Sequence, residues 1–497
     1  MKKLNIKIKF IAMIILTTMI SCSDDFVDVE SNAENSEAFF NSEGDYQNAL
    51  IGAYDLLQST YINVIMGEIA SDNTLCGGEN ATDVIGFQEI DDMTHTPVNS
   101  NLRDLWSWMW AGVNRANYIL EFKDKTDFVG KDQVIAQATF LRAYYYFELV
   151  KWFGDVPLII DQRILFGDQF NVDRTPKADV YAQIEIDLIY AASVLPAIQA
   201  EQGRITKGAA QALLGKAYLY QGKFPEAASV LEELILTGPY DLVTDYSTIF
   251  EEVGENNIES VFEVQYTDLE GAGFGCLQCS EGNVAVGFNG IRNYGATPNS
   301  AGDIFSSGFS FNVPVQEAYD AFDIDDLRKD VAILDIDAWA TSTGATFGTG
   351  FEHTGYFNRK YLPRKRNAGA QGDLNLTNPN NYRAIRFADV LLMAAEAFNR
   401  GSIDDSKART YLNRVRRRAF GDLLHDVTSS GTTLTDAIYL ERRLELVGEG
   451  HRFFDLVRTG KAAQEINGFV TGKHELFPIP AIEIELTGNR WTQNPGY

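Results

Sequence analysis

Aromatic and polar side chains in two loop-like segments are the residues of this chain best suited to binding a ligand. The 497 residues include 31 Phe, 22 Tyr and 6 Trp, more than a hydrophobic core alone requires. Flat rings contact the apolar C–H faces of sugars, while amide, carboxylate and guanidinium groups bond the surrounding hydroxyls. The candidates of these kinds are Asp72, Asn73, Phe87, Arg292, Asn293, Tyr294, Phe309, Trp339 and Tyr356. Trp339 stands alone in the polar stretch 337–341 and is the first candidate, with a place in the core as its alternative.

Catalytic and metal-binding patterns are incomplete in the sequence. The chain has 69 acidic residues, so their number alone does not exclude a glycoside hydrolase. Hydrolysis needs two carboxylates at a defined separation, and the sequence shows no such pair. The five His form neither H-E-x-x-H nor a close pair. We therefore expect no catalytic residue, no cofactor and no metal site, with a structural calcium ion as the open alternative.

Three cysteines outside the N-terminal segment favour one disulfide and one buried thiol. Cys276 and Cys279 form a lone C-x-x-C in a glycine-rich stretch, and Cys76 lies far from them in sequence. Zinc would need a second pair, and a redox role would need a βαβ setting. We predict a disulfide that staples a loop, formed either by Cys276 and Cys279 or by Cys76 and one of them.

The N-terminal segment has the pattern of an export signal. Lys2 and Lys3 precede an apolar run over 10–20. At 1.5 Å per residue this run spans about 16 Å, half a bilayer, so it is a signal-peptide core rather than a membrane-spanning helix. The run ends at Cys22 in a pattern similar to a lipobox, although Met19 stands where Leu is usual. We expect a signal peptide over 1–21, a lipidated Cys22 and a flexible tether over 22–35; the alternative is a plain secretory peptide with an incidental Cys22.

Net charge restricts the partners of the chain. The formal charge is −27, and loss of the four lysines in 1–21 makes it −31. Such a field repels phosphate backbones, which excludes general nucleic-acid binding. It also favours a neutral ligand over a polyanionic one.

Helical periodicity accounts for most of the chain. In the region 207–237, apolar residues recur every three or four positions on both sides of Gly222, which indicates a tetratricopeptide-type helix pair. The small Gly215 allows close approach of its two helices. Trp106 and Trp110 are four residues apart in another expected helix and share one face of it. The helices predicted from such spacing span 43–58, 101–121, 132–151, 179–195, 382–400 and 404–419.

The periodicity stops between about 240 and 380. Glycines crowd together there, 260–266 alternates like a strand, and a helix is expected near 314–321. Long ordered loops inside a domain are commonly functional. We predict a mostly α fold in which helix pairs over about 43–237 and 382–420 pack against a loop-rich half over about 240–380. The loop 71–100 is assigned to the same ligand-binding half.

Sequence blocks spread over the chain resemble the SusD/RagB family. They lie at 141–147, 153–158, 203–210, 386–397, 441–446 and 449–460, with a matching C-terminal end at 477–480 and 493–497. The charged block contains Arg442, Arg443, Glu445, Glu449, Arg452 and Asp455, whose alternating signs predict an ion-pair network within a helix and its neighbour rather than ligand contacts.

The resemblance implies a single SusD-like domain over 36–497. It also implies a lipid-anchored protein of the outer membrane, facing the cell surface, that binds glycans without cleaving them. Its partner would be a SusC-like TonB-dependent transporter, over which it acts as a lid. A neutral glycan is expected, with a β-glucan such as laminarin as the working choice. The alternatives are a surface glycoside hydrolase, or a scaffold or peptide-binding component of the transporter complex.

Overall fold

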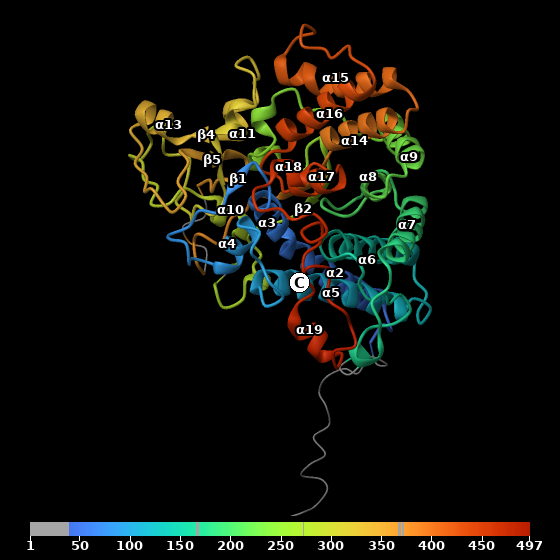
Figure 1. Cartoon of the computed structure of the whole chain (residues 1–497). Coiled ribbons are helices and arrows are strands. Elements are labelled where there is room, and N and C mark those ends of the chain that lie inside the picture. The colour runs from blue at the N-terminus through green and yellow to red at the C-terminus, as the bar shows by residue number, and fades with distance from the viewer. Residues whose placement is uncertain (1–38, 166–167, 272, 366–368, 370–371) are drawn as a thin grey trace, which may run out of the picture.

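The computed structural model describes residues 39–497 apart from 166–167, 272, 366–368 and 370–371. The predicted signal peptide over 1–21, the predicted lipidation of Cys22 and the whole predicted tether over 22–35 therefore lie outside the described residues. Within them, no helix is long and apolar enough to cross a membrane. The fold is mostly α, as the sequence predicts, with a few two-stranded sheets (Figure 1).

A series of packed helices builds the larger part of the molecule. Each helix from α5 to α9 packs on the next, and α14 packs on α9 and carries α15 and α16 (Figure 1). These helices are α5 (Ser100–Glu121), α6 (Lys131–Phe153), α7 (Lys177–Val194), α8 (Lys207–Tyr220), α9 (Phe224–Thr237), α14 (Phe387–Arg400), α15 (Asp405–Phe420) and α16 (Gly431–Leu446). Helices α2 (Glu43–Asp55) and α3 (Tyr61–Ile69) precede the series. The predicted helix pairs are confirmed.

Local signals explain where α8 and α9 begin and how closely they pack. The side chain of Thr206 accepts a hydrogen bond from the N–H of Ala209 and caps α8. Gly222, at φ +71°, follows α8, and Pro225 occupies the first turn of α9. A Cβ at Gly215 would lie 2.4 Å from Leu231 of α9. The two helices can therefore approach this closely only because position 215 carries no side chain.

The loop-rich half contains short elements around a smaller core. Its strands are β1 (Thr74–Leu75), paired with β3 (Val313–Pro314), and β4 (Ile333–Asp335), paired with β5 (Tyr356–Asn358), all antiparallel. Its helices are α4 (Ile85–Asp91), α10 (Val284–Asn289), α11 (Gln316–Asp320), α12 (Lys329–Ala332) and α13 (Ile336–Thr343). The smaller core includes Ile291, Tyr294, Phe305, Ile336 and Phe357. This half lies beside α3 and α16 in Figure 1.

Two predicted helices differ from the structure. The helix predicted over 382–400 begins as strand β6 (Tyr382–Arg386), which pairs with β2 (Ser260–Val264) and is buried throughout. Residues 382–386 form a strand because they pair with β2, which is distant in sequence. The spacing of apolar residues does not reveal such a partner. The charged block likewise is not one helix, since α16 ends at Leu446 and α17 (Arg452–Arg458) follows. Gly448 and Gly450 separate them at φ +81° and +84°, a region that interrupts a right-handed helix.

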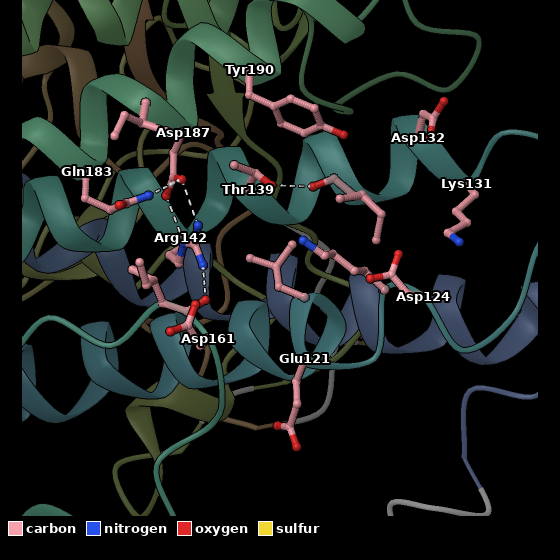
Figure 2. Close-up of a pocket in the computed structure, with 15 residues that line it drawn as sticks. Glu121, Asp124, Lys131, Asp132, Thr139, Arg142, Asp161, Gln183, Asp187 and Tyr190 are labelled. Carbon is pink, nitrogen blue, oxygen red and sulfur yellow. Dashed lines mark hydrogen bonds and ion pairs between the residues drawn. The ribbon is translucent and has the colours of Figure 1, made fainter.

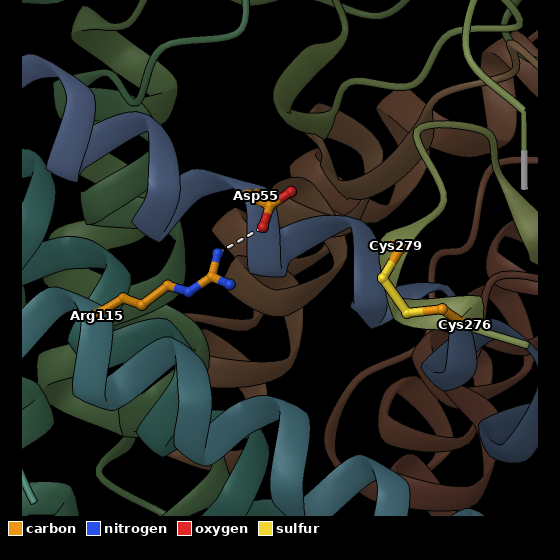
Figure 3. The surroundings of a disulfide bond; sticks show 4 residues. All are labelled: Asp55, Arg115, Cys276 and Cys279. Atoms are coloured by element: carbon orange, nitrogen blue, oxygen red, sulfur yellow. Dashed lines mark hydrogen bonds and ion pairs between the residues drawn. A yellow bond between two sulfur atoms is a disulfide. The ribbon is translucent and has the colours of Figure 1, made fainter. Parts of the chain in front are cut away.

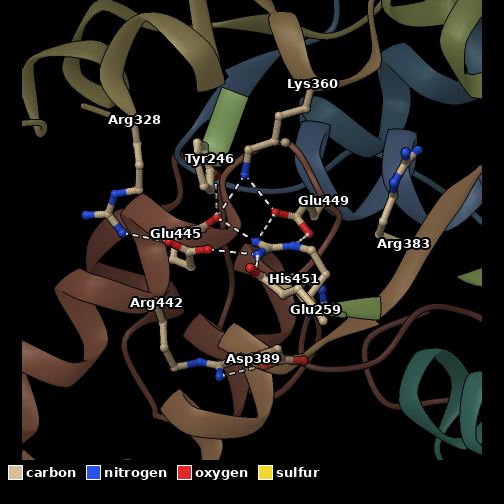
Figure 4. A network of polar contacts seen from close by, with 12 residues as sticks. Tyr246, Glu259, Arg328, Lys360, Arg383, Asp389, Arg442, Glu445, Glu449 and His451 are labelled. Carbon is tan, nitrogen blue, oxygen red and sulfur yellow. Dashed lines mark hydrogen bonds and ion pairs between the residues drawn. The ribbon is translucent and has the colours of Figure 1, made fainter. Parts of the chain in front are cut away.

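The charged block forms the buried ion-pair network that the sequence predicts (Figure 4). Arg386, at the end of β6, lies at its centre and donates to Glu259, Glu445 and Glu449 over 2.6–2.9 Å. Lys360 of the loop-rich half donates to Glu449 over 2.7 Å. These groups are almost fully buried. The network therefore connects the sheet β2–β6, the loop-rich half and α16.

Candidate functional site

Two aromatic side chains, packed edge to face, emerge at the surface of the loop-rich half. Phe274, in the loop before the disulfide, is 61% exposed, and its ring centroid lies 5.8 Å from that of the partly buried Phe309. Phe309 in turn lies 5.8 Å from Phe288, which packs edge-on against Phe87 and Phe311 in the core. A column of rings thus runs from the core to solvent and supports the exposed ring of Phe274.

Polar groups surround these rings. The guanidinium of Arg292 donates to the carbonyl of Phe309 over 2.9 Å and lies 3.5 Å from the carboxylate of Asp83. The Nε of Arg292 has no acceptor among the described residues. Asn293 is exposed beside it. We call Asp83, Phe274, Arg292, Asn293 and Phe309 the aromatic platform.

Backbone hydrogen bonds tie the loops of the aromatic platform together. The N–H of Gly78 donates to Ser310, the N–H of Phe351 to Gly78 and the N–H of Gly348 to Arg292, all over 2.8–2.9 Å. A Cβ at Gly350 would lie 2.5 Å from the carbonyl oxygen of Gly78, so glycine is required for this contact. The loops 76–84, 290–296, 308–311 and 344–352 are therefore joined, and the polar groups stand on a braced surface.

This arrangement suits a ligand with apolar faces and many hydroxyls. The rings of Phe274 and Phe309 can lie against C–H groups, Arg292 can donate to hydroxyl oxygens, and Asp83 and Asn293 can accept from hydroxyls. Because Phe274 and Asn293 are exposed, a ligand can reach them from solvent.

The structure brings three predicted site residues together on the aromatic platform, namely Arg292, Asn293 and Phe309. The candidates chosen from the sequence do not include Phe274, which lies in the glycine-rich stretch before Cys276. The signal that could have identified Phe274 is a large apolar residue between glycines and beside a C-x-x-C. A glycine-rich loop provides few neighbouring side chains that could bury such a residue. Asp83, between the candidates Asn73 and Phe87, was also missed.

Trp339 and Tyr294 form a separate pair. The indole N–H of Trp339 donates to the Tyr294 hydroxyl over 2.9 Å, and that hydroxyl donates to the carbonyl of Gly302 over 2.6 Å. Burial raises the pKa of Tyr294, so its hydroxyl remains a donor at neutral pH. Trp339 is partly buried against Phe305 and under the guanidinium of Arg359. Tyr294 thus belongs to the smaller core, and Trp339 packs against that core.

Asp72 lines a cleft of about 440 Å³ to which Arg443 of α16 also contributes, and Asn73 lies next to it in the interior. The Asp72 carboxylate accepts two hydrogen bonds from Arg452, over 2.7 and 2.8 Å, and lies 3.2 Å from Arg443. Asn73 is fully buried and accepts from Arg443 over 2.8 Å. Both side chains thus attach the loop 71–100 to the charged block.

Phe87 and Tyr356 pack inside the protein. Phe87 is 2% exposed and belongs to the main core. Tyr356 is 9% exposed, stacks on Tyr319 at 4.7 Å and donates to Gln316 over 3.0 Å. Neither ring presents a face that a ligand could reach in this conformation.

Cys276 and Cys279 form a disulfide, shown in Figure 3 near the ion pair of Asp55 and Arg115. Both cysteines are exposed. Cys76 is a free, buried thiol whose pKa burial raises. Of the three pairings that the sequence left open, the structure has the one between Cys276 and Cys279, and Cys276 is two residues from Phe274.

A polar cavity of about 710 Å³ opens between α5, α6 and α7 (Figure 2). Its buried Arg142 binds both carboxylate oxygens of Asp187, over 2.8 and 2.7 Å, and also the carbonyl of Ile160. Gln183 donates to the same carboxylate. Because Arg142, Asp187 and Gln183 already hydrogen-bond one another, the cavity has fewer free polar groups for a sugar than the aromatic platform has. Among the residues that the structure describes, no group of three or more His, Cys, Asp or Glu is placed to hold a metal ion.

Family models match two parts of this chain. The model of the SusD family matches residues 336–476, and a model described as "Starch-binding associating with outer membrane" matches residues 25–219. A solved structure titled "Laminarin binding SusD-like protein" is 36% identical, covers 92% of this chain and 100% of its own, and superposes with a TM-score of 0.83. These helices and loops thus have the fold of the SusD-like proteins. The chain belongs to the SusD family.

Two further relatives are similar over nearly the whole chain. Surface glycan-binding protein A from Bacteroides thetaiotaomicron, solved in complex with laminarihexaose, is 28% identical over 91% of this chain and 99% of its own, with a TM-score of 0.79. SusD-like protein P2 from Formosa agariphila is 28% identical over 99% of this chain and 100% of its own.

Proposed function

We propose that this protein is a cell-surface glycan-binding protein and that the aromatic platform is its glycan-binding site. The observation that carries the proposal is the exposed ring of Phe274, supported by Phe309 and flanked by the guanidinium of Arg292. Exposed aromatic faces are costly in water, and a sugar ring covers them while its hydroxyls bond the neighbouring polar groups. Two similar solved structures have titles that name laminarin or laminarihexaose as their ligand.

The glycan we propose is a neutral β-glucan such as laminarin. A formal charge of −27 disfavours alginate or sulfated chains. The platform's one cationic side chain, Arg292, already faces Asp83, so no cluster of free positive charge is present there to attract an anionic sugar.

The proposed role is capture rather than cleavage. A lipid on Cys22 anchors the protein to the outer membrane, with its body facing the outside of the cell. There it holds the glycan and passes it to a SusC-like TonB-dependent transporter, which it covers as a lid. The lipobox-like segment and the membership of the SusD family support this placement.

Binding by the soluble protein, residues 23–497, tests the proposal. We expect laminarin to retard the protein in affinity electrophoresis, and neither alginate nor a sulfated glycan to do so. Phe274→Ala and Arg292→Ala should each weaken laminarin binding about tenfold, since losing one stacking or charge-assisted contact is worth about 1.4 kcal/mol. The dissociation constants are measured by isothermal titration calorimetry.

Matched variants on distant surfaces provide the controls. Leu424→Ala removes an apolar side chain that is 90% exposed, and Arg103→Ala removes an exposed guanidinium on α5. Both should bind laminarin as the unchanged protein does. Platform variants that bind as tightly as these controls, or release of short sugars from laminarin during incubation, would contradict the proposal.

A further inference from the structure

Three of the six tryptophans of the chain line one pocket far from the aromatic platform in sequence. Trp106 and Trp110 come from α5, and Trp491 follows the C-terminal helix α19 (Ala481–Leu486), which contributes Glu483. We call this the tryptophan pocket. Its volume of about 310 Å³ is at the lower end of the roughly 300–1,000 Å³ of small-molecule sites. In Figure 1, α19 lies at the end of the molecule away from α13 and the loop-rich half.

The rings of the tryptophan pocket are held in place by their surroundings. The centroid of Trp106 lies 6.0 Å from that of Trp110 and 6.2 Å from that of Trp491. Trp106 also packs edge-on against Phe153, and the indole N–H of Trp491 donates to the carbonyl of Val172 over 2.8 Å. The aromatic wall is therefore formed before any ligand arrives.

The carboxylate of Glu483 is a polar group that a ligand in the pocket can reach. Glu483 is partly buried, and burial raises its pKa although a hydrogen bond from Trp106 lowers it. The indole nitrogen of Trp110 has no acceptor among the described residues, but it is buried and a ligand does not reach it in this conformation.

These features together restrict the ligand. An aliphatic group would cover the rings but would donate nothing to Glu483. A small hydrated cation would pair with Glu483 but would leave the apolar ring faces uncovered. A pyranose ring covers an indole with its C–H face and donates a hydroxyl to the carboxylate.

We propose that the tryptophan pocket is a second carbohydrate site, which binds a single hexopyranose unit. It is separate from the aromatic platform and does not depend on the role proposed for that platform. A polysaccharide repeats the same unit many times, so occupancy of two sites by one chain raises its apparent affinity without any new contact.

Fluorine NMR of 5-fluorotryptophan-labelled protein tests the proposal, with methyl β-D-glucopyranoside as the probe. The six tryptophans give resolved signals that single Trp→Phe variants assign. We expect the signals of the tryptophan pocket to shift in a saturable manner at sugar concentrations up to about 50 mM, above the millimolar range typical of ligands this small. The signal of Trp152, which is fully buried elsewhere, should not shift.

Variants assign the shift to the pocket. Ala111→Phe fills the pocket from its partly exposed wall and should abolish the shift, while Ala178→Phe on exposed α7 should not. Glu483→Gln should weaken binding severalfold and keep the fold. In a Phe274→Ala/Arg292→Ala double variant the shift should persist, which separates this proposal from the proposed function. Pocket signals that do not move, or that still move in Ala111→Phe, overturn it.

Discussion

Glu68 shows how burial changes the chemistry of one residue. Its side chain, on α3, is fully buried. One carboxylate oxygen accepts the N–H of Gly450 over 2.8 Å, and the other has no hydrogen-bond partner in the part of the chain that the structure describes. Burial raises the pKa of Glu68 from 4.5 to about 7. The folded state therefore holds this proton more tightly than the unfolded state does. The resulting stabilisation is complete below pH 4.5 and is lost as the pH rises through 7.

Glu68→Gln should remove this pH dependence. An amide keeps the acceptor for Gly450 and carries no charge to desolvate, so the variant should gain stability relative to the unchanged protein as the pH rises. We expect a gain on the order of 2 kcal/mol between pH 5 and pH 8. Urea unfolding at both pH values measures it. Glu317→Gln, at an exposed carboxylate, is the control, and a Glu68→Gln curve parallel to that control would refute the assignment.

At the scale of elements, the disulfide loop presents the exposed ring of the aromatic platform. Cys276 and Cys279 close a short turn two residues after Phe274, and Leu277 between them packs against the main core. A restrained loop loses less conformational entropy when its side chains are immobilised by a ligand. The disulfide therefore prepares Phe274 for binding more than it stabilises the whole fold.

Removing the disulfide should weaken glycan binding and leave thermal stability nearly unchanged. We expect Cys276→Ser/Cys279→Ser to raise the dissociation constant for laminarin about threefold, equivalent to about 0.6 kcal/mol of added ordering cost. Calorimetry measures the affinity, and circular dichroism the melting temperature. Dithiothreitol should reproduce the effect in the unchanged protein and have none in the variant. Equal affinities, with or without reductant, would show that the disulfide does not position Phe274.

At the scale of the whole molecule, the buried ion-pair network joins parts that are distant in sequence. Arg386 pairs with Glu259, a residue that follows helices α5 to α9 in the sequence. Lys360 and Arg328 join the loop-rich half to Glu449 and Glu445 of the charged block (Figure 4). The arginines hold the pKa values of Glu445 and Glu449 below their usual range. Orientation of the two halves thus depends on charges that must be paired once they are buried.

Arg386→Ala should destabilise the protein severely. The substitution removes the positive charge that pairs with Glu259, Glu445 and Glu449 in the interior. Breaking a buried ion pair in this way lowers the free energy of unfolding by about 3–5 kcal/mol. Arg103→Ala, which breaks an exposed pair with Asp104, should cost less than about 1 kcal/mol. Urea unfolding followed by tryptophan fluorescence compares the two. Similar losses in both variants would mean that the network does not hold the halves together.

Much of the fold could be predicted from the sequence because helices are local. The spacing of apolar residues, the cap at Thr206 and the missing side chain of Gly215 lie within a few turns of the contacts they determine. The family blocks likewise identified the SusD family. Periodicity failed at 382–386, because a strand depends on a partner more than 100 residues away.

The candidate site could be predicted only in part, because exposure is a property of the assembled loops. From the sequence alone we predict that aromatic and polar residues of the loops bind a sugar, and the candidates include Arg292, Asn293 and Phe309. Only the tertiary structure decided that Phe87 is buried and that Phe274 is exposed, since four loops from distant parts of the chain meet there. Phe87 and Phe274 have the same chemistry. The fold decides which of the two rings is covered by neighbouring residues and which is exposed.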